Sequence, residues 1–469
     1  MPINSIQTFI YLYIFNLKIA SHSGTAFFKI GGKAVRERMG MHKYSAWLWP
    51  GLASAVVLTS FAIRGSDLPA AATMLAALFA ALTAAAFILP AAESPALLRR
   101  KAVRPLLVAL AVFIAALALS IVFAVYDPSA AWLEAIKLGG VFCAFALGLR
   151  CSLTDERARR LFDALLYIGG AWAVMSIFMF ILDPDGIYGI AKFGAGRLTG
   201  AFSSPNSAGT LFGALGVMAL GRVVSRVLTR KEPQIVERID PVMAGVCAVS
   251  LAALMLTISR GAIFATVVCA AGLCILLLRD HLSLSKLVAV GVAAIVALAV
   301  LFATPLSNVI GRLDSVDRDA LVRATILKSH FSFAMHQPWL GSGLGSFNTV
   351  NSHIVTAHNY PELAVIRATH NVYLQWFEEA GGIGLTALGL LNIAVLAPMI
   401  SGARRRRQMG GRIWAILAGY LVFLIHGFTD YAFQEPALAL FMALLLGCGF
   451  GMACNITGTR GAGGHDRAT

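Results

Sequence analysis

Charged side chains are scarce in this sequence. Of its 469 residues only 13% are Asp, Glu, Lys or Arg, whereas 58% are hydrophobic. Soluble domains carry about 25% charged residues, so the composition excludes an ordinary soluble globular protein. Apolar runs of about 20 residues, the length that crosses a bilayer as a helix, recur along the chain. The sequence therefore predicts one all-α, polytopic integral membrane helical bundle.

The sequence also lacks the usual metal and redox motifs. Its seven cysteines lie in or beside apolar runs without CxxC spacing, and its ten histidines include no HExxH. The glycine-rich segment 338–345 lacks the strand-turn-helix setting that a dinucleotide site needs, so we interpret it as a glycine-bent loop. We expect neither a metal ion nor a cofactor.

About twelve apolar segments fit membrane-spanning helices. They are 45–63, 69–90, 105–125, 132–150, 161–182, 204–223, 241–258, 261–278, 285–304, 371–400, 412–429 and 435–454. The predicted organisation is an N-terminal segment 1–44, nine helices over 45–304, a loop over 305–370, three helices over 371–454 and a disordered tail over 455–469. The first 40 residues differ from the rest in being rich in Asn, Ile, Lys and Phe. A peripheral amphipathic segment and a mistaken start, with Met39 or Met41 as the true one, explain this equally well.

The basic residues indicate the orientation of the bundle. The net charge of +15 comes largely from Lys and Arg in short loops between apolar runs, where they act as orientation signals rather than as a nucleic-acid surface. These clusters precede the first predicted span and follow spans two, four, six, eight and ten. All of them therefore fall on one side, which we expect to be cytoplasmic and to hold both termini.

Three arginines contradict this pattern. Arg197, Arg260 and Arg323 fall on the outward side, and so does His370 at the end of the long loop. Binding of an anion at the outer membrane face is the simplest explanation for them. The loop itself is long enough to suggest a function, and the spacing of apolar residues over 319–336 predicts short helices lying over the bundle.

Structural explanations compete with function at these positions. Asn206 follows Pro205 in a pattern typical of a helix start, Arg197 fits a surface cation, and a tight turn explains Gly261 but not Arg260. Glu379 lies about 180° around an ideal helix from His370, so we expect it to pair with an arginine or cap a neighbouring helix. His426 and Asp430 share a helix face, for which core polar pairing and function are equally good explanations.

Four of these segments together resemble the O-antigen ligase and polymerase family of membrane glycosyltransferases. They are GRLTGAFSSPN (196–206), TISRGA (257–262), Arg323 with PWLGSGLGSF after it, and HNVYLQWFEEAGGIG (370–384). Each is weak alone, but their order and outward placement are similar to the family pattern. The acidic position of the last segment is matched by Glu379, with Glu378 beside it as the other candidate.

The resemblance implies a GT-C-like bundle with a large periplasmic loop between helices nine and ten, in the bacterial inner membrane. It also implies a donor glycan on undecaprenyl diphosphate and a sugar acceptor such as lipid A-core. In this scheme His370 is the catalytic general base of a metal-independent inverting transfer, and Arg197, Arg260 and Arg323 bind the diphosphate. Asn371, Asn206, Glu379 and Tyr373 support them.

Two alternatives remain open at the level of sequence. A polymerase of O-antigen or exopolysaccharide repeat units, which uses a lipid-linked glycan as acceptor, fits the same motifs as a ligase. A transporter or flippase of lipid-linked oligosaccharide also fits twelve spans. Transporters, however, more often place charges at mid-membrane and show repeat symmetry, whereas these charges gather at one face beside one large loop.

Overall fold

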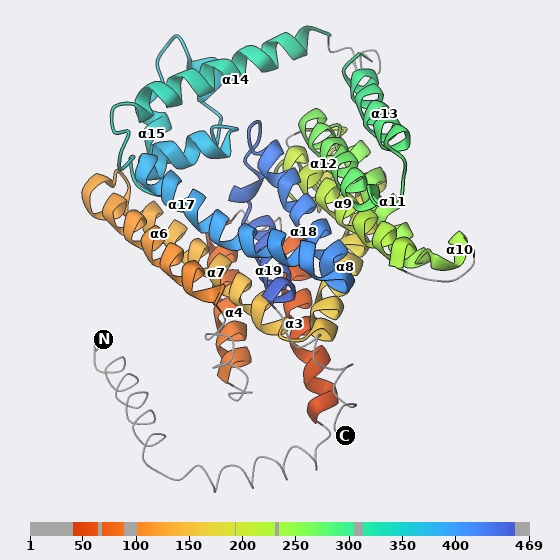
Figure 1. Cartoon of the computed structure of the whole chain (residues 1–469). Helices are drawn as coiled ribbons and strands as arrows, with labels where there is room; N and C mark the ends of the chain where they lie inside the picture. The colour runs from red at the N-terminus through yellow and green to blue at the C-terminus, as the bar shows by residue number, and fades with distance from the viewer. Residues whose placement is uncertain are drawn as a thin grey trace, which may run out of the picture. The chain divides into compact units, whose positions relative to one another are not determined.

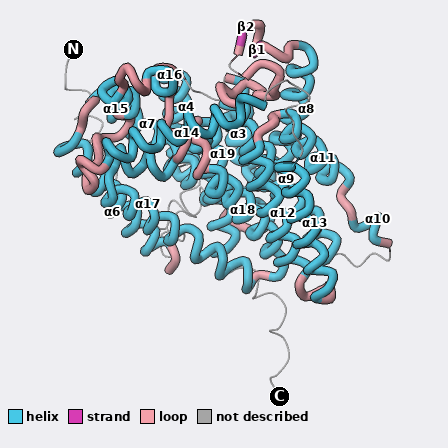
Figure 2. Tube along the Cα trace, turned by 90° about the horizontal axis from the view of Figure 1, so that it is seen from above, coloured by secondary structure: helices cyan, strands magenta, loops and turns pink. Residues whose placement is uncertain are grey.

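The computed structural model describes residues 41–63, 68–88, 101–192, 194–229, 234–303 and 313–454. It divides into two compact units, Met1–Trp49 and Pro50–Thr469. Of the first unit only residues 41–49 are described, and they begin a helix. Most of the predicted N-terminal segment and the predicted tail 455–469 lie outside the described residues, as do residues 304–312. The described part of the second unit is predominantly helical (Figure 1, Figure 2).

Each of the twelve predicted apolar segments overlaps a helix among the described residues. These helices are α3 (Met41–Ala62), α4 (Pro69–Ile88), α6 (Val103–Ala124), α7 (Pro128–Cys151), α8 (Asp155–Leu182), α9 (Pro205–Thr229), α11 (Pro241–Leu256), α12 (Arg260–Leu278), α13 (Leu284–Ala303), α17 (Val372–Arg405), α18 (Arg407–His426) and α19 (Pro436–Cys454). Among the described residues, nine of them are long and apolar enough to cross a membrane, while α3, α11 and α13 offer shorter apolar stretches. A polytopic all-α membrane protein is confirmed, and the count of twelve crossings stays a prediction.

The connections carry a few smaller elements. Between α8 and α9, the strands β1 (Gly186–Ile187) and β2 (Ile190–Ala191) pair antiparallel, and α10 (Ile235–Arg238) follows α9. The described part of the predicted loop holds α14 (Leu313–Ala334), α15 (Phe347–Ile354) and α16 (Tyr360–Leu363), and the 3-10 helix η3 (Ala432–Gln434) precedes α19. Helices were expected in this loop, and α14 is longer than a short helix. In Figure 1, α14 and α15 lie above α17.

Helices α9 and α19 form the centre of the bundle. Helix α9 packs against α8, α11, α12 and α18, whereas α19 packs against α7, α8, α17 and α18. Small residues allow close approach: a Cβ added at Gly447 would overlap the Phe145 carbonyl, and one at Gly148 would overlap the Leu444 carbonyl. Lipid tails are as apolar as the helices, so the hydrophobic effect does not drive helices together in a membrane. Close packing through small residues such as glycine is the usual way in which they associate.

Ion pairs join several helices at one end of the bundle. Asp163 on α8 accepts a hydrogen bond from Arg222 of α9 at 3.1 Å and lies 3.6 Å from Arg412 of α18. Arg226 donates to Asp240 at 3.1 Å. These arginines belong to the clusters predicted to be cytoplasmic. Asn206, at the start of α9, lies about 30 Å along the helix from Arg226, roughly the thickness of the hydrocarbon core.

Helix α17 is broken at Gly381, which has φ 65° and ψ −177°. The glycine-rich segment inserts into the break. Backbone N–H groups of Ser342 and Gly343 donate to the carbonyls of Glu378 and Glu379, at 2.8 and 2.9 Å. The N–H of Gly382 in turn donates to the Pro338 carbonyl at 2.7 Å. The loop thus supplies hydrogen bonds to backbone groups that lost their partners where the helix breaks. Backbone groups need such partners wherever lipid excludes water.

A buried pair fastens α14 to α17. The Nδ1 atom of His330 lies 2.6 Å from a Glu378 carboxylate oxygen, and both side chains are inaccessible to solvent. The His330 ring also stacks on Phe347 of α15, with centroids 4.8 Å apart. Because α14 carries Arg323 two helical turns before His330, this pair positions that arginine over the bundle.

Candidate active site

Residues 369–373 dock onto the C-terminal end of α18. The Val372 N–H donates to the Gly427 carbonyl at 2.9 Å, and the Asn371 side-chain amide donates to the Phe428 carbonyl at 3.1 Å. The Tyr373 hydroxyl donates to the Leu424 carbonyl at 2.7 Å. The last carbonyls of a helix lack intrahelical partners, so these contacts satisfy both segments at once. Asn371 also caps α17, since its side chain accepts from the Leu374 N–H.

His370 lies within this docked segment in a left-handed backbone conformation, with φ 55°. Such a conformation is uncommon for a residue with a side chain, and it clusters at functional sites. The His370 ring meets Tyr431 edge to face at 5.1 Å, and its Nδ1 atom is 4.0 Å from an Asp430 carboxylate oxygen. Burial, aided by the charge of Arg323, lowers the pKa of His370 to about 4. The imidazole is therefore neutral at pH 7.

Asp430 is the buried acid of the site. Its side chain is completely buried, and burial raises its pKa to about 7. The backbone N–H of Tyr431, the charges of Arg323 and Arg197, and the Asn206 side chain all oppose this rise. A buried carboxyl with a raised pKa thus lies beside a histidine ring, and perturbed pKa values cluster at functional sites.

Arg197 holds the turn between α11 and α12. Its Nε donates to the Thr257 carbonyl at 2.9 Å, and its Nη2 donates to the Asn206 side chain at 3.1 Å. The residue that follows Thr257 is Ile258, which adopts φ 52° although it is β-branched. That conformation is a genuine outlier and requires support from its surroundings. Arg197 and Asn206, predicted to act together, are brought into direct contact.

Arg260 stands at the first position of α12 and is half-buried. It forms no hydrogen bond or ion pair with any residue that the structure describes. The next residue, Gly261, packs so closely on α18 that an added Cβ would lie 2.8 Å from the His426 ring. Arg260 is therefore held beside the C-terminal end of α18, four residues before Asp430, with its guanidinium available to a ligand.

Arg323 reaches the same region from α14. Its positive charge helps to lower the pKa of His370 and opposes the rise in the pKa of Asp430. It is half-buried. The structure thus gathers His370, Arg323, and the pair Arg197 and Asn206 from three segments that are far apart in the sequence.

Glu379 is not part of this cluster. Its carboxylate accepts hydrogen bonds from the Gly345 N–H at 2.8 Å and from the Gln375 side chain at 3.0 Å. Gln375 in turn accepts from the backbone N–H of Thr369 at 3.3 Å. Glu379 is thus linked through Gln375 to the residue before His370. The expected separation of Glu379 from His370 is observed, and its partners are backbone and amide groups rather than an arginine.

Two features of the site were missed by sequence reasoning. Asp430 was noticed only as a neighbour of His426, yet the structure turns it toward His370. His426 instead pairs with Thr210 of α9, with Nδ1 2.7 Å from the hydroxyl oxygen. Gln375, the link to Thr369, carried no signal at all. A polar residue at the outer end of an apolar segment was the available signal for Asp430.

Comparison with known protein families matches one part of the chain. A sequence model described as O-antigen ligase matches residues 245–389. The matched segment, less than a third of the chain, supports a membrane protein of the O-antigen ligase and polymerase type, a family of glycosyltransferases. The ligase segment contains Arg260, Arg323, His370 and Glu379, whereas Arg197, Asn206 and Asp430 lie outside it. No curated protein sequence is similar enough to the chain to count as a match.

Proposed function

We propose that this protein transfers a glycan from undecaprenyl diphosphate to a sugar hydroxyl, such as that of lipid A-core, at the periplasmic face of the bacterial inner membrane. One observation carries the proposal: His370 lies 4.0 Å from the buried Asp430 carboxyl, and the charges of Arg323 and Arg197 act on this pair. In this proposal both termini are cytoplasmic, and the end of the bundle where Asp163 binds Arg222 faces the cytoplasm.

His370 acts as the general base. It is neutral at pH 7, so it can accept the proton of an acceptor hydroxyl without first losing one. Asp430 faces its Nδ1 atom, which favours the tautomer with a proton on Nδ1 and the lone pair on Nε2. Asn371 and Tyr373 act indirectly, because their hydrogen bonds to α18 hold His370 in its left-handed conformation.

The arginines hold the diphosphate. Arg260 has donors available, and Arg323 lies over the cluster from α14. Guanidinium groups bind phosphate through two parallel hydrogen bonds and stabilise the charge that grows on a leaving diphosphate. Arg197 contributes charge while fixing the turn 257–259 that presents Arg260. This arrangement supports a transfer without a metal ion.

The reaction is a single displacement. The acceptor oxygen forms a bond to the anomeric carbon while the bond from that carbon to the diphosphate oxygen breaks. The acceptor proton passes to Nε2 of His370, and undecaprenyl diphosphate leaves with the bonding electrons, its charge balanced by the arginines. Attack from the face opposite the leaving group inverts the configuration of the sugar.

The acceptor distinguishes a ligase from a polymerase, and the phenotype of a deletion strain separates them. Lipopolysaccharide and secreted polysaccharide are resolved by size on a gel after the gene is removed. Bare lipid A-core with polymer left on its carrier indicates the ligase, whereas single-repeat caps or loss of long exopolysaccharide indicate the polymerase. A normal gel pattern would contradict both.

Complementation tests the catalytic residue. His370→Ala should fail to restore the gel pattern, since losing a general base costs about 100- to 10,000-fold in rate. His353→Ala, which alters an exposed histidine on α15, is the matched control and should restore it. Restoration by both variants would exclude this active site and favour the transporter.

A further inference from the structure

The side chain of Gln375 joins the backbone before His370 to a buried carboxylate. Its oxygen accepts a hydrogen bond from the Thr369 N–H at 3.3 Å, and its Nε2 donates to Glu379 at 3.0 Å. Gln375 and Glu379 are four residues apart, so they share one face of α17. Each is only 8% exposed, and Thr369 is 1% exposed. Loss of either hydrogen bond would therefore leave a buried polar group without a partner.

The far end of this series of hydrogen bonds is the glycine-rich loop. The second carboxylate oxygen of Glu379 accepts from the Gly345 N–H at 2.8 Å. Gly345 adopts φ 69°, in the left-handed region that glycine reaches most readily. The series thus runs from the loop 338–345 through Glu379 and Gln375 to the backbone of Thr369.

The chemistry of the series specifies a glutamine at position 375. The Thr369 N–H can only donate, so it requires an acceptor. The Glu379 carboxylate, which already receives the Gly345 N–H, requires a donor. The amide of glutamine presents one acceptor and two donors on a chain of suitable length. An ionised glutamate would offer only acceptors, a lysine only donors, and asparagine is one carbon shorter.

The backbone of His370 is held on both sides. On its N-terminal side the Thr369 N–H is bound by Gln375, and on its C-terminal side the Val372 N–H donates to the Gly427 carbonyl at 2.9 Å. His370 itself has φ 55°. A side-chain-bearing residue persists in that conformation only where its surroundings impose it. The two flanking hydrogen bonds impose it here.

We propose that Gln375 is a positioning residue that, together with Glu379, holds the His370 ring in place for proton transfer. Neither side chain touches the reacting atoms, and both act through the backbone of residues 369 and 370. The inference rests on the proposed function, since the direction of the ring matters only if His370 takes the acceptor proton. It also gives a role to Glu379, whose hydrogen bonds go to an amide and a backbone group.

Exchange of the two side chains tests the proposal. Gln375→Glu places two carboxyl groups against each other, and Glu379→Gln leaves the donors of Gln375 and Gly345 with one oxygen between them. In the double variant, the amide at position 379 donates to the carboxylate at position 375. Its oxygen accepts from Gly345, and the carboxylate accepts from Thr369. Every group then has a partner again.

The reaction is measured in lipid nanodiscs with an undecaprenyl-diphosphate glycan as donor. Lipid A-core and a second lipid-linked repeat are both offered as acceptors. Each single variant should lower kcat about 10- to 100-fold, because a shift of about 1 Å in a reacting group has an effect of that size. The donor KM should stay unchanged, since the arginines hold the diphosphate. The double variant should be faster than either single variant.

A double variant that fails to fold, or that is no faster than the single variants, would overturn the proposal. So would single variants with a lower Tm but an unaltered kcat per folded molecule, because Gln375 would then serve only packing. If neither single variant folds, a folded and active double variant supports the proposal, and a folded but inactive one overturns it. Turnover of no acceptor by the unaltered protein would count against the proposed function instead.

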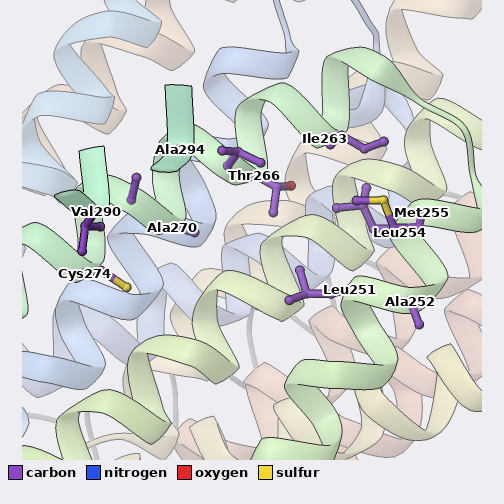
Figure 3. A pocket seen from close by; sticks show the side chains of 12 residues that line it. Leu251, Ala252, Leu254, Met255, Ile263, Thr266, Ala270, Cys274, Val290 and Ala294 are labelled. Carbon is purple, nitrogen blue, oxygen red and sulfur yellow. The ribbon is translucent and has the colours of Figure 1, made fainter. Parts of the chain in front are cut away.

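A matched control lies elsewhere in the bundle, beside an apolar cavity between α11, α12 and α13. Figure 3 shows Thr266 of α12 in its wall, and none of the residues 369–379 lines it. The buried Thr266 hydroxyl donates to the Ala262 carbonyl at 2.7 Å. Thr266→Val removes this hydrogen bond at almost constant size and should leave kcat unchanged. Gln408→Glu, the same substitution as in Gln375→Glu at an exposed position of α18, should also leave it unchanged.

Discussion

The Nδ1 atom of His370 lies 4.0 Å from the Oδ1 atom of Asp430, and the aspartate is completely buried. This separation exceeds a hydrogen bond, for which the donor and acceptor atoms are at most about 3.2 Å apart. Catalytic hydrogen bonds are often long before substrate binds and shorten afterwards. Nδ1 is buried without a hydrogen-bond partner among the described residues. A small rotation of the ring toward Asp430 would therefore satisfy it.

Replacing Asp430 should separate activity from stability. Its pKa is raised to about 7 in the folded protein from a usual value of 3.8. Between about pH 4 and 7 the carboxyl ionises in the unfolded protein but stays protonated in the folded one, so the free energy of unfolding falls as pH rises. Asp430→Asn removes this loss, and its Tm at pH 8 should exceed that of the unaltered protein. Activity should fall by about a hundredfold or more, because the tautomer of His370 is no longer fixed. A lower Tm of Asp430→Asn at pH 8 would contradict the claim that the buried Asp430 carboxylate destabilises the folded protein.

Arg323 should control the acid limit of activity. Its positive charge disfavours protonation of His370 and helps lower the histidine pKa to about 4. Arg323→Gln removes the charge, so the pKa of His370 rises and the acid limb of kcat/KM moves to higher pH. Lys328→Gln, an exposed position on the same helix, is the control. If the acid limb of kcat/KM does not move in Arg323→Gln, the Arg323 charge does not act on His370.

The membrane helices could be predicted from sequence because lipid leaves few solutions. Every backbone group in the hydrocarbon must be paired, so each apolar run of sufficient length becomes a helix. The basic clusters could also be grouped in advance, and their members Arg222 and Arg412 do meet at Asp163. The arginines Arg197, Arg260 and Arg323 were singled out because they contradict the orientation signal, and their outward placement stays a prediction.

Contacts between distant segments could not be predicted. The pairing of His370 with Asp430 depends on how α17 docks on α18, and hydropathy does not specify that packing. A break at the glycines of the segment 371–400 was left open by the sequence, but its place at Gly381 was hidden, because a glycine in an apolar run is tolerated in an unbroken helix. Its meaning appears only when the segment 338–345 inserts and takes over the hydrogen bonds.

Substitution of Gly381 should damage both stability and activity. Its backbone angles are those that only glycine adopts readily, and an added Cβ would overlap the Trp339 carbonyl. Gly381→Ala should lower the free energy of unfolding by about 1–3 kcal/mol or more. Gly389→Ala is the control in the same helix, where nothing lies within 4 Å of the new methyl group, and it should be neutral or slightly stabilising. Thermal unfolding in detergent gives the Tm of both variants. Equal Tm values would contradict the claim that the break at residue 381 requires glycine.

Lysine substitutions should distinguish the two arginines near the turn 257–259. Arg197→Lys loses the paired donors that hold Thr257 and Asn206, so Tm should fall and the strained Ile258 should lose its support. Arg260 has no such partners among the described residues, so Arg260→Lys should change stability by no more than about 0.5 kcal/mol. Its donor KM should nevertheless rise about tenfold, because a point charge does not reproduce the two parallel hydrogen bonds of a guanidinium on phosphate. Measurement of Tm and donor KM on both variants separates a structural from a binding role, and a destabilised Arg260→Lys with unchanged KM would reverse the assignment.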